Sequence, residues 1–132
     1  MTVVLLDTTF LVDAERAGLD IDHVIDDEDD VAVAAITVAE MLVGVELASS
    51  KHRPQREAFV SDVVSSIPIV PYDLSVAREH ASLLAAVRMA GRPRGAHDLI
   101  IAATARATKR KVISADPAAF ADLPDVDVQA HR

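Results

Sequence analysis

Short apolar runs alternate along this chain with longer stretches in which apolar residues recur every three or four positions. A short continuous apolar run is typical of a parallel strand that is buried on both faces, whereas the longer period indicates a helix with one buried face. Pro68 and Pro71 flank part of one run, which therefore belongs near a sheet edge. The predicted strands are Val3–Leu6, Val31–Ile36, Ile67–Val70, Val112–Ser114 and Val126–Val128.

Helices are predicted in the stretches that separate these strands. The stretch from His97 is apolar on most sides, which predicts a deeply packed helix. Because strands and helices alternate, the pattern predicts an α/β sandwich with a mostly parallel sheet. Without a linker or an internal repeat, residues 1–132 are predicted to form a single domain. The predicted helices are Thr8–Arg16, a short one within Ile21–Asp27, Thr37–Ala48, Pro54–Ser66, Leu74 to near Gly91, His97–Thr108 and a short one after Asp116-Pro117.

Four acidic residues stand at predicted helix starts. Asp7 and Asp116 each follow an apolar run, Glu40 comes shortly after another, and Asp98 lies in a first helical turn. Ligands of parallel sheets bind beyond the carboxyl ends of the strands, where these acids should meet. At about 5 Å and an effective dielectric near 20, each pair repels by roughly 3 kcal/mol, so a divalent cation is expected between them. All four are candidate catalytic and metal-binding residues, with Asp7 as the principal ligand.

Each acid also has a purely structural interpretation. Thr37 and Glu40 have the spacing of a capping box, in which Glu40 reaches back to the N–H of the cap. Asp116 before Pro117 suits an N-cap, and a carboxylate at Asp98 suits the positive end of a helix dipole. Asp7 can simply end a strand and begin a helix. Capping requires four independent coincidences, whereas one oxygen-rich cavity explains all four acids.

Carboxylate and water oxygens are the ligands that Mg²⁺ and Mn²⁺ prefer. The five histidines lack the spacing of a zinc site, and His97 beside Asp98 orients a carboxylate, contacts substrate or simply packs. Such an ion activates water and neutralises charge at a phosphorus under attack. Thr9 and Ser114 are candidates to hold a water or a phosphate oxygen, although hydroxyl bonding to the local backbone is an equal alternative.

Composition limits the choice of partners and location. The net charge is −8, which argues against a protein that coats nucleic acid, and part of it is the run 26–30, interpreted as a solvated turn. One Tyr and three Phe do not make a platform for stacking bases. Phosphate contacts would come from Arg92, Arg94 and 109–111. The absence of cysteine fits the cytoplasm, and neither a signal peptide nor a membrane span is predicted.

Four segments together resemble the PIN-domain ribonucleases, most closely the VapC-type toxins of bacterial toxin–antitoxin pairs. The segments occur in the family's order and extend over nearly the whole chain. Thr9 stands where the family often has serine, a change that keeps the hydroxyl. The matching segments are Leu5-Leu6-Asp7-Thr8-Thr9, Thr37-Val38-Ala39-Glu40, His97-Asp98-Leu99-Ile100-Ile101-Ala102-Ala103-Thr104-Ala105 and Ile113-Ser114-Ala115-Asp116-Pro117-Ala118-Ala119-Phe120.

This resemblance implies a PIN-like three-layer α/β/α sandwich, a Mg²⁺ or Mn²⁺ site formed by Asp7, Glu40, Asp98 and Asp116, and cleavage of RNA phosphodiester bonds. It also implies a homodimer and a small cognate antitoxin of the VapB type. The antitoxin's C-terminal segment would wrap the toxin and push an arginine toward the acids. Its expected docking surface here is formed by the helices Val38–Ala48 and Pro54–Ser66.

Two other function classes remain open at the level of the sequence. The first is a phosphoryl-transfer domain, such as a haloacid-dehalogenase-like phosphatase or a response-regulator receiver. The former needs an aspartate two residues after Asp7, where Thr9 stands, and the latter needs adjacent acids and a late lysine that 114–116 lack. The second is a non-catalytic α/β module that only binds a partner.

Overall fold

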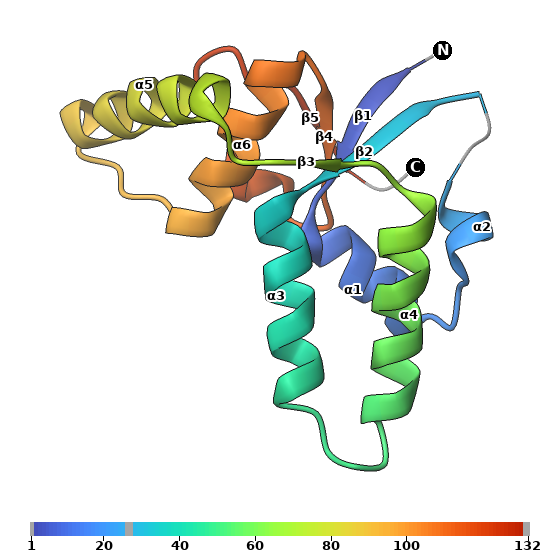
Figure 1. Cartoon of the computed structure of the whole chain (residues 1–132). Coiled ribbons are helices and arrows are strands. Elements are labelled where there is room, and N and C mark those ends of the chain that lie inside the picture. The colour runs from blue at the N-terminus through green and yellow to red at the C-terminus, as the bar shows by residue number, and fades with distance from the viewer. Residues whose placement is uncertain (1, 26–27, 131–132) are drawn as a thin grey trace.

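A five-stranded parallel sheet forms the centre of the molecule in the computed structural model, which describes residues 2–25 and 28–130. The strands are arranged in the order β3-β2-β1-β4-β5 (Figure 1). The predicted parallel sheet is therefore confirmed, with the two-residue β3 at an edge as its prolines indicated. The strands are β1 (Val3–Leu6), β2 (Asp30–Ala34), β3 (Ile69–Val70), β4 (Lys111–Ile113) and β5 (Val128–Gln129).

Helices cover both faces of this sheet, as predicted for an α/β sandwich. Figure 1 shows α3 and α4 lying side by side below the sheet, with α5 and α6 in a separate group. In residues 2–25 and 28–130, no helix has the length and apolar character needed to cross a membrane. The helices are α1 (Thr8–Arg16), α2 (Ile21–Val24), α3 (Ala35–Glu46), α4 (Arg53–Ser66), α5 (Leu74–Ala90), α6 (Ala96–Thr108) and the 3₁₀ helix η1 (Pro117–Phe120).

The alternation of side chains along β1 divides the interior into two cores. Val4 and Leu6 pack with residues of α1, α2, α3 and α4, whereas Leu5 packs with residues of α5 and α6. Successive side chains of a strand point to opposite faces, so a strand made only of large apolar residues supplies both cores at once. The fully apolar run at the N-terminus is thus explained by its central position, and it carries Asp7 to the middle of the sheet edge.

Several predicted boundaries differ from the structure. The strand predicted as Val31–Ile36 ends at Ala34, and α3 begins at Ala35 instead of Thr37. Ala34 is still extended, whereas the residues after it are already helical, so an apolar run that looked like one strand is divided between two elements. The last strand is displaced from the predicted 126–128 to 128–129.

Asp30 corrects the interpretation of the acidic run as a solvated turn. It begins β2, and its carboxylate oxygen Oδ1 accepts a hydrogen bond of 2.9 Å from Arg110 Nη1. The same guanidinium donates to the carbonyl oxygens of Val4 and Asp30 and so joins the amino ends of neighbouring strands. Glu28 is exposed, and Asp26 and Asp27 lie outside the described residues.

Two arginines of α4 fix the end of α3. Arg53 donates to the carbonyl oxygens of Val45, Glu46 and Ala48, and Arg56 donates to that of Gly44. The last carbonyls of a helix have no partner within the helix, so guanidinium groups that reach them stabilise its end. The carboxyl end of α3 and the start of α4 are therefore held together by side chains.

Replacing Phe120 with alanine should destabilise the fold strongly. Its ring is fully buried in the core shared by α5, α6 and β4. Removing such a ring leaves a cavity and costs about 3–5 kcal/mol of unfolding free energy. Urea unfolding followed by circular dichroism measures this, with Met89→Ala as the control because Met89 is 89% exposed. An unfolding midpoint equal to that of the native chain would contradict the assigned core.

Candidate active site

The acids gather where the chain changes direction across the sheet. From β1 the chain builds outward through β2 to β3, and then returns to place β4 on the other side of β1. Asp7 directly follows β1, and its backbone N–H donates to the carbonyl oxygen of Ile113 at the end of β4. A crevice opens between neighbouring strands at such a reversal, and ligands of parallel α/β sheets bind there.

Asp7 is 2% exposed and held on both carboxylate oxygens. Its Oδ1 accepts the backbone N–H of Phe10 at 3.1 Å and the Thr9 hydroxyl at 2.6 Å. Its Oδ2 accepts the Ser114 hydroxyl at 2.7 Å. Asp7 therefore caps α1, as its structural interpretation proposed, and also presents a fixed carboxylate at the centre of the sheet edge.

Thr9 and Ser114 connect the two strand ends. The Thr9 hydroxyl, which donates to Asp7, also accepts the N–H of Ala115 at 3.1 Å. Ser114 accepts the N–H of Asp116 at 2.9 Å. Both hydroxyls thus combine local backbone bonding with bonding to Asp7, so that the loop after β4 is fixed against the start of α1.

Glu40 does not form the capping box that its spacing suggested. Because α3 begins one turn earlier than Thr37 would require, that threonine is buried inside the helix and the cap position is Ala34. The carboxylate of Glu40 instead accepts the Thr8 hydroxyl at 2.8 Å and lies 3.4 Å from His97 Nδ1. Glu40 is thereby oriented from α1 and α6, and His97 takes the carboxylate-orienting role considered for it.

Asp98 lies in the first turn of α6. Burial raises the pKa of its carboxyl above the ordinary value, and the negative charges of Asp7, Glu40 and Asp116 raise it further. Gly95 gives this carboxylate room, since a Cβ there would lie 2.8 Å from Asp98 Oδ2. Because the charges of Asp7, Glu40 and Asp116 all act on Asp98, the four predicted acids lie in one region of negative potential.

A pocket of about 220 Å³, called the acid pocket below, contains most of this cluster. Asp116 is not among its lining residues, and it does not cap η1 through its side chain. Sequence reasoning missed Thr8, Asp13 and Arg16. The positions Thr9, Asp13 and Arg16 share one helix face, a signal that becomes visible only once α1 is placed over the acids. The lining residues are Asp7, Thr8, Thr9, Val12, Asp13, Arg16, Glu40, Asp98 and Ile101.

Most of the basic residues predicted to contact phosphate lie elsewhere. Lys109, Arg110 and Lys111 come at the amino end of β4, opposite the acids, where Arg110 bonds the backbone. Arg94 donates to the carbonyl oxygens around η1, including that of Ala119 at 3.0 Å. Arg92 is exposed in the loop before α6 and does not line the acid pocket. Strand direction, which a local run of charges does not reveal, places Lys109, Arg110 and Lys111 away from the acid pocket.

The donor set fits a hard divalent cation in chemistry. Asp7, Glu40 and Asp98 line the acid pocket with carboxylate oxygens, the ligands that Mg²⁺ and Mn²⁺ prefer. Within the part of the chain that is described, no group of three or more acids or histidines is arranged to hold one ion. Mg²⁺ is commonly held by only one or two carboxylates together with waters and substrate phosphates, which this arrangement can supply.

Comparison with known proteins identifies related folds. A family model described as PIN domain matches residues 4–126. A comparison of the sequence with curated proteins gives no match. VapBC2 from Rickettsia felis, solved with a DNA fragment of its promoter, superposes with a TM-score of 0.88 at 18% identity, covering 99% of this chain and 100% of the other.

Two further solved structures have higher sequence identity. VapBC-5 from Mycobacterium tuberculosis, a member of the VapBC family of toxin–antitoxin systems, is 29% identical with a TM-score of 0.76, covering 100% of this chain and 99% of the other. FitAcB from Neisseria gonorrhoeae is 29% identical with a TM-score of 0.66, covering 95% of each chain. The expected three-layer α/β/α arrangement is therefore confirmed.

Replacing Asp98 with asparagine should stabilise the metal-free protein at neutral pH. Because the pKa of Asp98 is raised in the folded state, the stability it contributes is full below its unfolded pKa and is lost as pH rises through the folded pKa. Asparagine avoids this loss. In urea unfolding without divalent metal, the unfolding free energy of the variant relative to that of the native chain should increase between about pH 3 and about pH 7. The exposed carboxylate of Asp62 provides the control Asp62→Asn, and parallel pH curves for native and Asp98→Asn would contradict this.

Proposed function

Since the chain belongs to the PIN domain family, we propose that it is a metal-dependent endoribonuclease and the VapC-type toxin of a toxin–antitoxin pair. The proposal rests on one observation above all. Asp7, Glu40 and Asp98, contributed by separate parts of the chain, line a single pocket at the carboxyl edge of the sheet. A fold that brings these carboxylates together needs a compensating positive charge, and a divalent cation supplies it.

The side chains around the pocket determine what each acid can do. The buried carboxylate of Asp7 is fixed by hydroxyls on both oxygens, so it is the principal metal ligand. Glu40 is oriented by Thr8, and Asp98 completes the opposite wall. Asp116, outside the pocket, adds negative charge and is proposed as a ligand of a second ion or of a bound water. One or two Mg²⁺ or Mn²⁺ ions would supply an activated water and neutralise charge on the phosphodiester.

We further propose a small VapB-like antitoxin and a second copy of the chain as partners. Solved structures with the same fold include complexes whose names describe toxin–antitoxin assemblies. On this chain, Leu42 and Val43 of α3 and Leu47 at its C-cap are exposed, with Leu47 81% accessible. Exposed apolar side chains that cluster on one helix are typical of a protein interface. The outer surface of α3 and α4 is accordingly the proposed docking surface of the antitoxin.

The variants Asp7→Asn and Asp98→Asn should each lower RNA cleavage at least about a hundredfold, because they remove an anionic ligand and leave its shape. The measurement is cleavage of cellular RNA by purified protein with Mn²⁺, together with mapping of the cleaved ends after induced expression. Asp62→Asn, which changes an exposed carboxylate on α4, should cleave like the native chain. Full activity in both site variants, with circular dichroism showing intact folding, would refute the assignment.

The double variant Leu42→Asp/Leu47→Asp should weaken binding of the antitoxin. Two charges placed on the exposed face of α3 would have to be desolvated in the complex. The experiment co-expresses each variant with the product of an adjacent short gene and measures the amount that co-purifies. Met89→Asp, on the exposed face of α5, controls for added charge. Equal recovery of the partner with both variants would place the interface elsewhere.

A further inference from the structure

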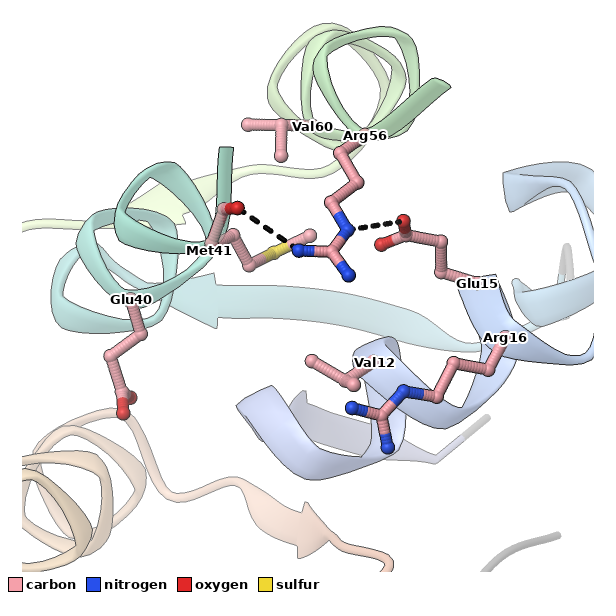
Figure 2. Close-up of a pocket in the computed structure, with 8 residues that line it drawn as sticks. Val12, Glu15, Arg16, Glu40, Met41, Arg56 and Val60 are labelled. Atoms are coloured by element: carbon pink, nitrogen blue, oxygen red, sulfur yellow. Dashed lines mark hydrogen bonds and ion pairs between the residues drawn. The ribbon is translucent and has the colours of Figure 1, made fainter. Parts of the chain in front are cut away.

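Among the described residues that line the acid pocket, Arg16 is the basic one. It lies at the end of α1, and it lines both the acid pocket and an adjoining pocket of about 160 Å³ formed by α1, α3 and α4. Helical side chains lean toward the amino end of their helix, which is the end of α1 that Asp7 caps. Figure 2 shows the Arg16 side chain running back along α1 past Val12, toward the side of the view where Glu40 lies.

Several other arginines are engaged in holding the fold. Arg56 also lines the adjoining pocket, but it donates to the carbonyl oxygen of Gly44 and lies 3.9 Å from Glu15, as the dashed lines in Figure 2 show. Arg53, Arg94 and Arg110 donate to backbone carbonyls. Within residues 2–25 and 28–130, the guanidinium of Arg16 has no such hydrogen bond or ion pair. It is therefore available to a ligand.

The ligand suited to this position is a phosphate group. Arginine remains charged at any physiological pH, and its planar group matches the oxygens of a phosphate in two parallel hydrogen bonds. The carboxylates of Asp7, Glu40 and Asp98 line the same pocket. Metal ions bound to them would contact one phosphate of the RNA, and the neighbouring phosphates of the strand would then have to be bound by side chains of the protein. The chain has a net charge of −8, so a positively charged side chain at this place would attract a polyanion locally.

We propose that Arg16 binds a backbone phosphate of single-stranded RNA next to the bond that is cleaved, and so positions the strand across the acids. This inference rests on the proposed ribonuclease function. Arg16 contributes ground-state binding, so its loss raises KM and changes kcat little. The contact is to the backbone, so its effect is the same for every RNA sequence.

The binding test compares Asp7→Asn alone with Asp7→Asn/Arg16→Ala and Asp7→Asn/Arg78→Ala. Fluorescence anisotropy with a short single-stranded RNA of random sequence, in the presence of Mn²⁺, gives the affinity at several salt concentrations. Arg16→Ala should weaken binding about tenfold and reduce the salt slope by roughly 0.7. Arg78, exposed on α5 and outside the acid pocket, provides the matched loss of charge and should have no such effect. Arg16→Lys should recover part of the affinity.

Kinetics in the otherwise native chain separate the possible outcomes. A raised KM with nearly unchanged kcat for Arg16→Ala supports the proposal, whereas unchanged KM and affinity overturn it. Tighter Mn²⁺ binding by Arg16→Ala with unaltered RNA binding also overturns it, because Arg16 would then act only as a counter-ion of the acids. A native chain that neither binds nor cleaves RNA contradicts the proposed function and the inference with it. Cleavage by the native chain with a KM and an RNA affinity that Arg16→Ala leaves unchanged contradicts the inference alone.

Discussion

Repulsion between carboxylates is the constraint around which the carboxyl edge of the sheet is built. Burial, together with the charges of Asp7, Glu40 and Asp116, raises the pKa of Asp98, so folding works against the ionised form of this side chain. Hydroxyl groups from Thr8, Thr9 and Ser114 hold two of the acids in place despite that repulsion. The fold thus keeps a locally unfavourable arrangement, a common property of sites whose purpose is to bind an ion.

Family membership and the geometry of Asp7 narrow the alternatives that the sequence left open. A PIN domain is inconsistent with the haloacid-dehalogenase-like phosphatase and the receiver. The hydroxyl of Thr9 stands where that phosphatase would need a second aspartate, and here it donates to Asp7. Several arginines, among them Arg53, Arg94 and Arg110, donate hydrogen bonds to backbone carbonyls and are thereby engaged in holding the fold.

Local patterns were sufficient to predict much of the fold. The apolar run of β1 and the glycine after α5, which adopts a left-handed conformation at φ 65°, depend on neighbouring residues alone. The carboxyl-edge position of Asp7 also followed, since strand direction fixes it. The start of α3 was predicted wrongly because Thr37 and Glu40 carry a capping signature. Their actual partners lie on α1 and α6, and long-range contacts of this kind leave no trace in local spacing. The same reason hid Arg16, whose importance depends on the placement of α1.

The bonds from Arg53 and Arg56 to the carbonyl end of α3 have a mechanical consequence. They couple two helices at the end remote from the sheet, where a short connection alone would leave them free to separate. A force applied to the start of α4 is therefore transmitted to α3. Since Glu40 lies on α3 with its carboxylate hydrogen-bonded to Thr8, this one helix connects the contacts with α4 at the distal end to the acid cluster.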